Sequence, residues 1–255
     1  MIEHLLTPCI PHRFLSDKRY CDGHLRVVNA LPERRVLGLH IPDMKGVAAR
    51  LIRDEGCAII DKFEQFDATA FSHEEIMVWG FMINLEKCSV ERRFERLARF
   101  VPVMDNWAVC DSFCANAKWA AKVDKRVLWA HLQGWFSSSC EFEVRFALVM
   151  SMTYLMSADW IDKVFDRIAG LDYARIASRY VFQRGKPAAP QMGVVAGRSP
   201  YYVRMAVAWL LATALYRFPE QTRRFLSATP LPEDVLKMYV RKAKDSFRTR
   251  SMSAF

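Results

Sequence analysis

The sequence predicts an all-α fold, and three observations support this prediction. Nearly every segment of the 255 residues repeats its apolar side chains at helical spacing. Strand-like alternation of apolar and polar residues is scarce. Helix-start signals precede several of the periodic segments. The predicted helices run approximately over residues 18–29, 43–54, 72–85, 90–101, 105–121, 124–136, 140–155, 159–169, 199–217, 219–227 and 234–247.

The start signals justify individual helices in order along the chain. Pro42 and Asp43 open the helix at 43–54, because proline and an acidic residue both suit a first helical turn. Ser72, three residues before a glutamate, has the spacing of a capping box for the helix at 72–85. Asp105 or Asn106 precedes the helix at 105–121, and the Ser-Pro pair 199–200 opens the helix at 199–217.

The apolar pattern also predicts how these helices are layered. ERRFERLARF in the helix at 90–101 is clearly amphipathic and suits an outer layer, whereas RFALVMSMTYL and RMAVAWLLATALY are apolar over most of their circumference and suit inner helices. Antiparallel pairs with short links fit either a globular helical bundle or an α-solenoid of HEAT-like helix pairs, whose period is about 40 residues. We favour the solenoid, as a single domain over 1–255 with residues 1–19 as an N-terminal tail.

Residues 174–198 interrupt the helical pattern. This segment holds Gly, Pro and Ala in place of periodic apolar residues, and its only charged side chains are basic. It is typical of an inserted long basic loop or a short hairpin. A surface insertion of this kind is more often flexible than a phosphate-contacting arm, and the sequence leaves both interpretations open.

Charge and cysteine content limit the partners and the compartment. The net charge of +9 favours a polyanionic partner, nucleic acid before membrane, although a solvated basic surface without a partner is the alternative. No secretory signal and no apolar run of membrane-spanning length is visible, so we expect a cytoplasmic protein. The seven cysteines form no CxxC pair and are predicted to be reduced.

Four side chains stand out from this background. Trp107 and Asp111 lie four residues apart, which on a helix places an indole and a carboxylate on one face. Trp209 lies in the middle of an apolar helix, and Arg145 is a permanent charge in another. Each has a structural interpretation as well: tryptophan in the core, an acid that serves a helix dipole, or an arginine that pairs with Glu141 or Glu143.

Five segments in this order carry a resemblance to a known family: LGLHIPDMK, SHEEIMVWGFMI, VPVMDNWAVCDSF, FEVRFALVMSMTYL and SPYYVRMAVAWLLATAL. Over about residues 20 to 250 the chain resembles the HEAT-like repeat DNA alkylation repair family of AlkD-like DNA glycosylases. The resemblance implies an α-solenoid whose concave basic face grips duplex DNA, and hydrolysis that removes 3-methyladenine or 7-methylguanine. It implies neither a metal nor a cofactor.

The resemblance also assigns roles to residues. It implies that Asp111, Trp107 and Trp209 are the catalytic residues and that Arg145 contacts the DNA backbone at the lesion. A carboxylate at the sugar would stabilise the positive charge that develops there, and indole faces attract a cationic nucleotide. The further DNA-binding candidates are Tyr202, Arg204, Lys118, Lys122, Arg241, Lys242 and Lys244.

The sequence therefore predicts a monofunctional alkylpurine glycosylase of base excision repair, monomeric and associated with the nucleoid through DNA. Two alternatives stay open. One is a catalytically inactive relative that binds bent or branched DNA through its phosphates, because the segment before residue 20 is short where active members use N-terminal helices. The other is a HEAT-type scaffold for a protein partner.

Overall fold

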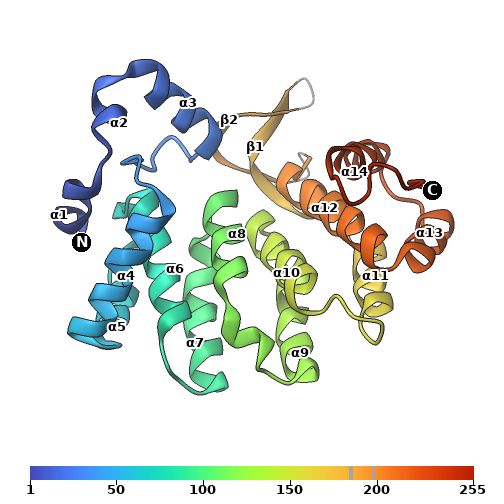
Figure 1. Cartoon of the computed structure of the whole chain (residues 1–255), viewed down its shortest axis with the longest axis horizontal. Coiled ribbons are helices and arrows are strands. Elements are labelled where there is room, and N and C mark those ends of the chain that lie inside the picture. The colour runs from blue at the N-terminus through green and yellow to red at the C-terminus, as the bar shows by residue number, and fades with distance from the viewer. Residues whose placement is uncertain (184–185, 197–198) are drawn as a thin grey trace. The chain divides into compact units, whose positions relative to one another are not determined.

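The computed structural model describes residues 1–183, 186–196 and 199–255, with side chains described through residue 180 and again from residue 199. The chain is predominantly α-helical, which confirms the predicted fold class (Figure 1). In this described part of the chain, no helix is both long enough and apolar enough to cross a membrane. The chain forms two compact units, residues 1–122 with 188–193 and residues 123–187 with 194–255.

Unit 1 is built on three helices that pack side by side, with α6 between α4 and α8. Shorter helices pack against this row: α1 and α5 contact α4, and α5 and α7 contact α6. The bounds are α1 Glu3–Leu6, α2 His12–Ser16, α3 Lys18–Val28, α4 Ile41–Glu55, α5 Ala58–Gln65, α6 His73–Leu85, α7 Val90–Phe100 and α8 Trp107–Asn116, with 3₁₀ turns η1 Thr7–Cys9, η2 Ala68–Ala70, η3 Val101–Val103 and η4 Lys118–Ala121.

The central helix α6 begins with the predicted capping box, in which the Ser72 side chain accepts from the backbone N–H of Glu75 and the Glu75 carboxylate accepts from that of Ser72. Two buried carboxylates follow Ser72. Glu75 also accepts from the backbone N–H of Ile2 (2.7 Å), and Glu74 accepts from that of Gly38 (2.8 Å). The start of α6 therefore holds two distant segments, because buried backbone donors need partners.

Helix α7 is amphipathic as predicted and buries two arginines of its apolar face. Arg96 pairs through its guanidinium with Glu86 (3.0 Å) and Glu64 (2.9 Å), both of which are themselves buried. These carboxylates raise the pKa of Arg96 above its already high ordinary value. A charge buried in this way is stable only because its partners are buried with it.

Unit 2 is built on α12, which packs against α10, α13 and α14, while α10 also packs against α9. The bounds are α9 Lys125–Phe136, α10 Glu141–Tyr154, α11 Ile161–Ala169, α12 Tyr201–Arg217, α13 Pro219–Ala228 and α14 Glu233–Asp245. Most side chains of α10 and α12 are buried, as their continuous apolar runs predict, although Trp209 and Tyr216 of α12 are exposed.

Residues 174–198 contain a two-stranded sheet of β1 (Ala177–Gln183) and β2 (Lys186–Ala196), which confirms the hairpin alternative for this segment. Two basic residues of this segment, Arg184 and Arg198, lie outside the described residues. Contact of the hairpin with phosphate stays a prediction.

Three parts of the chain differ from the predicted helices. The helix predicted over 105–121 is two elements, because Ala117 leaves the helical region (φ −75°, ψ 53°) between α8 and η4. Helix α5 was not predicted, since eight residues are too few for a periodic pattern to be distinctive. The predicted N-terminal tail contains the short helices α1 and α2.

Candidate active site

Helix α8 carries the predicted indole and carboxylate in unit 1. Asn106 is its N-cap, since the side-chain Oδ1 accepts from the backbone N–H of Ala108 at 2.7 Å. Trp107 is the first residue of the helix and Asp111 follows one turn later. Both side chains are half-buried, so neither residue belongs to the fully buried core, and their placement one turn apart on a helix agrees with the predicted spacing.

The start of α8 is bonded to the end of α3. Asn106 donates through Nδ2 to the Val28 carbonyl (2.5 Å), and the Trp107 indole N–H donates to the Val27 carbonyl (3.1 Å). Helix α3 ends at Asn29 in the left-handed conformation (φ 50°), which suits asparagine after a last helical residue. These two bonds orient the indole of Trp107 and bring α3 to the start of α8.

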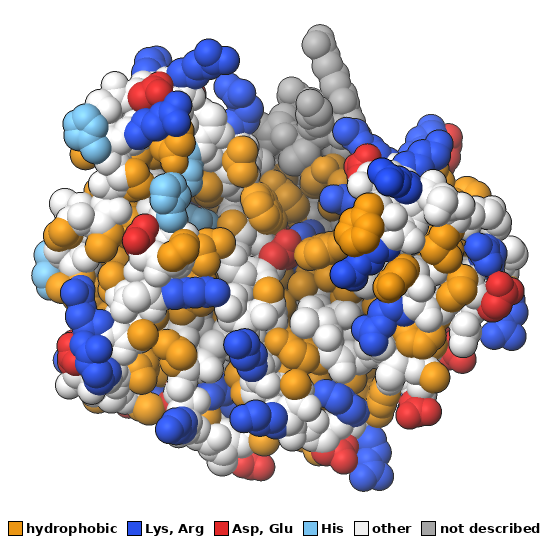
Figure 2. Space-filling model, viewed as in Figure 1, with side chains coloured by type: hydrophobic (Ala, Val, Ile, Leu, Met, Phe, Trp, Pro, Cys, Tyr) orange, Lys and Arg blue, Asp and Glu red, His pale blue; other side chains and the backbone are white. Residues whose placement is uncertain are grey.

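Two exposed lysines follow α8 in unit 1. Lys118 begins η4, and Lys122 comes directly after it. Among the residues that the structure describes, neither ammonium forms an ion pair, so both are available to a phosphate. Lys and Arg side chains are spread over the face of the surface drawn in Figure 2, between hydrophobic and uncharged groups.

The predicted backbone contact Arg145 lies buried in α10 of unit 2, with 3% of its surface exposed. Its Nη1 donates to the Tyr202 carbonyl (2.6 Å), and its guanidinium lies 5.8 Å from the centre of the Tyr202 ring. The sequence offered both a phosphate and a structural partner for this arginine. The structure supplies protein partners, and contact with DNA stays a prediction.

Glu141, at the start of α10, is buried beside Arg145. One carboxylate oxygen accepts from the backbone N–H of Tyr202 (2.7 Å) and the other from the Ser178 hydroxyl (2.5 Å). Burial raises the pKa of Glu141 to about 7, and the two hydrogen bonds and the nearby Arg145 lower it only in part. The carboxylate thus satisfies a donor at the start of α12, a helix with no side-chain N-cap.

Two other predicted DNA contacts in unit 2, Tyr202 and Arg204, also have protein partners. Tyr202 is buried, and its ring packs against Phe142 (5.3 Å between ring centres) and Tyr180 (4.8 Å). Arg204 donates to Asp234 at 2.6 Å and lies over the ring of Tyr173 (4.7 Å). A DNA contact by either side chain stays a prediction.

Trp209 is one of the exposed aromatic residues of α12, with 36% of its surface in solvent. It lines a pocket of about 600 Å³ together with the last turn of α12, the end of α14 and the turn that follows α14. Sequence analysis singled out Trp209 and Lys242, but it missed Tyr216, Phe247, Arg217 and Arg248, the other aromatic and basic side chains around this pocket.

A profile of the family described as DNA alkylation repair enzyme matches residues 15–175. The chain belongs to this family. Membership of this family gives the chain a role in DNA repair, and it implies that the chain contacts DNA. No curated protein matches the sequence in a direct search. No solved structure matches it either.

The span matched by the DNA alkylation repair enzyme profile covers some predicted site residues and leaves others out. It contains the α8 pair, Trp107 and Asp111, as well as Arg145 and the two exposed lysines. It ends before α12, so Tyr202, Arg204 and Trp209 are assigned only by the resemblance of their sequence block.

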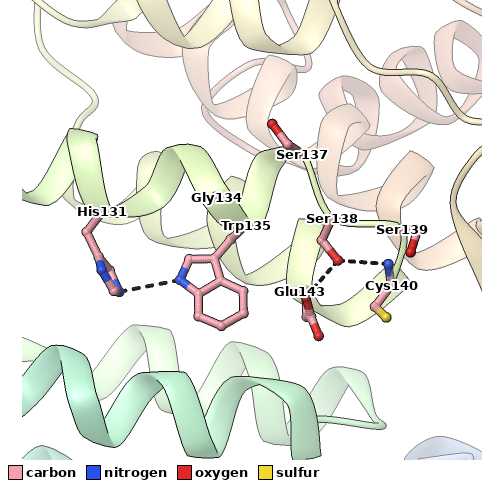
Figure 3. A pocket seen from close by; sticks show the side chains of 8 residues that line it. All are labelled: His131, Gly134, Trp135, Ser137, Ser138, Ser139, Cys140 and Glu143. Atoms are coloured by element: carbon pink, nitrogen blue, oxygen red, sulfur yellow. Dashed lines mark hydrogen bonds between the residues drawn. The ribbon is translucent and has the colours of Figure 1, made fainter.

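A second pocket of unit 2, about 650 Å³ in volume, lies where α9 ends and α10 begins (Figure 3). The Trp135 indole N–H donates to His131 Nε2 (3.4 Å), and Ser138 donates to Glu143 (2.6 Å). Burial lowers the pKa of His131 to about 4. Figure 3 shows the Trp135 ring between His131 and the Ser138, Cys140 and Glu143 side chains.

The described residues also contain no group of three or more His, Cys, Asp or Glu side chains arranged to hold a metal ion. Cys110 and Cys114, one turn apart on α8, are buried and reduced.

Proposed function

We propose that this family member is a monofunctional DNA glycosylase that hydrolyses the N-glycosidic bond of cationic alkylated purines, 3-methyladenine and 7-methylguanine, in duplex DNA. The observation that carries the proposal is the α8 pair: an indole fixed by Val27 and a carboxylate one turn later, both half-buried. On this proposal the chain acts as a monomer.

The fold supports a solenoid that would place α8 against DNA. In unit 1, α4, α6 and α8 pack in succession, and in unit 2, α10, α12 and α14 do the same. We assign these to the inner layer of HEAT-like helix pairs, whose curvature produces an extended concave binding surface. The net charge of +9 makes a concave basic face the expected complement of DNA.

The reaction needs stabilisation of positive charge and a water molecule. Methylation makes the purine cationic, so it leaves as a neutral base with the electron pair of the bond to C1′. The oxygen of a water molecule then bonds to C1′. The water keeps one proton in the new hydroxyl group and releases the other to solvent. In our proposal the Asp111 carboxylate stabilises the positive charge on the sugar and orients the water, while the Trp107 face attracts the cationic nucleotide.

The predicted site residues of unit 2 are assigned roles in the same reaction. Trp209, as an exposed indole, would provide a second aromatic face to the cationic nucleotide. Arg145, Tyr202 and Arg204 would act on the DNA backbone. Since Arg145 already bonds the Tyr202 carbonyl, we assign this pair to the orientation of α12 as well.

The test is release of methylated base from duplex DNA that carries 7-methylguanine, at low salt. Replacing a preorganised group that stabilises transition-state charge costs about 100- to 1,000-fold in rate, and we expect Asp111→Asn to lose base release by at least the lower figure. Duplex affinity should stay within about twofold, because the lost interaction belongs to the transition state. Asp162→Asn, an exposed acid of α11, is the control.

A second candidate is a catalytically inactive relative that binds bent or branched DNA through phosphates. The specific observation in its favour is that Lys118 and Lys122 are exposed and available to phosphates, whereas Arg145 of the proposed site bonds within the protein. The same assay decides between the two. Duplex binding without base release by either the native protein or Asp111→Asn would establish the inactive relative.

A further inference from the structure

The pocket beside Trp209 combines exposed aromatic rings with uncompensated positive charge. Tyr216 and Phe247 line it with 50% and 74% of their surfaces exposed. Phe247 is the most exposed aromatic side chain of the described residues. Rings left in water at this extent are unusual for a core-forming residue and indicate a surface that is covered by a ligand.

The two exposed aromatic residues of α12, Trp209 and Tyr216, lie on one stripe of a mostly buried helix. Trp209, Thr213 and Tyr216 follow one another at spacings of four and three residues, so their side chains point to the same side. Most other side chains of this helix are buried. The stripe is therefore the part of α12 that faces the pocket, and it presents two rings about two turns apart.

The turn after α14 supplies the opposite wall and is held in place by hydrogen bonds. The buried Thr249 donates through its hydroxyl to the Ala243 carbonyl (2.7 Å), and its backbone N–H donates to the Ser246 carbonyl (3.1 Å). Phe247 and Arg248 lie between these anchoring residues. The exposed ring is thus fixed by the turn and does not belong to a loose end of the chain.

Arg248 links the two walls. Its guanidinium lies 5.3 Å from the centre of the Tyr216 ring and 5.5 Å from that of Phe247. Within the described ranges, no carboxylate pairs with the Arg248 side chain. A guanidinium oriented on two rings keeps its N–H donors for an anion, and phosphate is the anion whose geometry it matches best.

The charge of the pocket is positive overall. Arg217, Lys242 and Arg248 line it against a single acid, Asp245, whose carboxylate lies 4.0 Å from Arg241. Arg217 and Lys242 lie in the last turns of their helices, where a cation also complements the helix dipole, so their placement alone has a structural explanation. The dipole does not explain Arg248 or the exposed rings.

We propose that this pocket binds an unpaired nucleotide of single-stranded DNA, with the base on the faces of Tyr216 and Phe247 and the phosphate on Arg248. Aromatic platforms beside basic side chains are how proteins bind single strands without reading their sequence. Bases within a duplex are already stacked on one another, so their faces are not available to these rings. A volume of about 600 Å³ is also in the range of about 300–1,000 Å³ usual for ligand pockets.

The experiment compares two strands with the same number of phosphates. A labelled oligothymidylate and an abasic strand of equal length are titrated with the full chain, and anisotropy gives both affinities. Since base stacking on an aromatic side chain contributes about 1–3 kcal/mol, the oligothymidylate should bind roughly 5- to 150-fold more tightly. Equal affinities of the two strands would overturn the proposal.

Variants assign the preference to the pocket. Phe247→Leu and Tyr216→Leu should each lower oligothymidylate affinity by at least about fivefold while affinity for the abasic strand stays the same. Arg248→Gln should weaken both strands. The matched control is Phe66→Leu, which replaces a 58% exposed ring of unit 1. An unchanged base preference in Phe247→Leu would place the base elsewhere and refute this assignment.

Two further arms separate the ligand source and the proposed glycosylase. If thymidine monophosphate competes at concentrations equal to the dissociation constant of the strand, the ligand is a free nucleotide and the assignment to single-stranded DNA is overturned. Competition only at much higher concentrations of the monophosphate supports the strand as the ligand. Asp111→Asn should keep the base preference. The pocket and the glycosylase can therefore fail independently.

Discussion

Helices α8 and α10 use acidic side chains in different ways. Asn106 caps α8 within its own first turn, and the acid Asp111 comes one turn inside the helix. Helix α10 starts with the acid itself, and Glu141 reaches away from its own helix to the backbone N–H of Tyr202 on α12. One acid is half-buried and the other almost fully buried.

The difference teaches that an acid in the first turn of a buried helix serves the fold. Glu74 and Glu75 at the start of α6 repeat the arrangement of Glu141, since each holds backbone donors of a distant segment. Asp111 is not in a first turn and does not cap α8. The position of an acid within its helix therefore separates structural carboxylates from the candidate for chemistry.

The largest expected effect that tests this comparison is a loss of folding stability when Glu141 is removed. Glu141→Ala leaves the Tyr202 N–H without its acceptor, removes the shorter of the two bonds of the Ser178 hydroxyl, and removes the carboxylate beside the buried Arg145. Leaving a buried polar group without its hydrogen-bond partner costs about 1–3 kcal/mol, and we expect a loss of about 3 kcal/mol in urea unfolding. Asp111→Ala should cost clearly less. An equal cost for the two would break the comparison.

The second effect is the pH dependence that Glu141 gives to folding. Its pKa is about 7 in the folded chain against 4.5 ordinarily, so the folded state binds the proton more tightly. This contribution is fully present below pH 4.5 and is lost as the pH rises to about 7. By linkage it amounts to about 3 kcal/mol over that interval.

The measurement is the free energy of unfolding of the native chain and of Glu141→Gln between pH 4.5 and 7.5. Subtraction removes other titrating groups, such as His73, whose pKa burial lowers to about 4 and whose contribution has the opposite sign. The native chain should lose stability relative to Glu141→Gln as the pH rises. Parallel curves would show that the carboxyl does not titrate in this range.

Much of the local structure could be predicted because local rules decide it. The capping box of α6 and the helix at 140–155 follow from short-range spacing and apolar pattern, and the structure has both within a residue or two. The pair Trp107 and Asp111 is also a local feature, since four residues on any helix give one face. The break at Ala117 was missed because no Gly or Pro marks it.

The partners of site residues could not be predicted, because they come from distant parts of the chain. Val27 and Val28 offer only backbone carbonyls to Asn106 and Trp107, and a backbone carbonyl leaves no signal in side-chain chemistry. The same holds for the Tyr202 groups that Glu141 and Arg145 bond. The sequence indicated that Arg145 needed a partner, but a carbonyl 57 positions away in sequence is visible only in the fold.

A smaller effect tests the attachment of α3 to α8. Asn106→Ala removes both the cap of α8 and the bond to the Val28 carbonyl, and we expect a loss of about 1–2 kcal/mol of unfolding free energy. Asn106→Asp keeps a capping oxygen but cannot donate to Val28. If the α3 contact positions Trp107, base release should fall in both variants while only Asn106→Ala loses the cap. Full base release by Asn106→Asp would show that the α3 bond is not needed for the site.

The smallest expected effect concerns single phosphate contacts and extends the comparison to cations. Lys118 has no ion-pair partner among the described residues, whereas Lys237 pairs with Glu233 at 2.5 Å. A lysine that neutralises one phosphate releases about one counterion, so Lys118→Gln should reduce the slope of log affinity for duplex DNA against log salt by about 0.9. Lys237→Gln should leave the slope unchanged. Equal slopes for all three proteins would place the DNA away from η4 and therefore away from the face that follows α8.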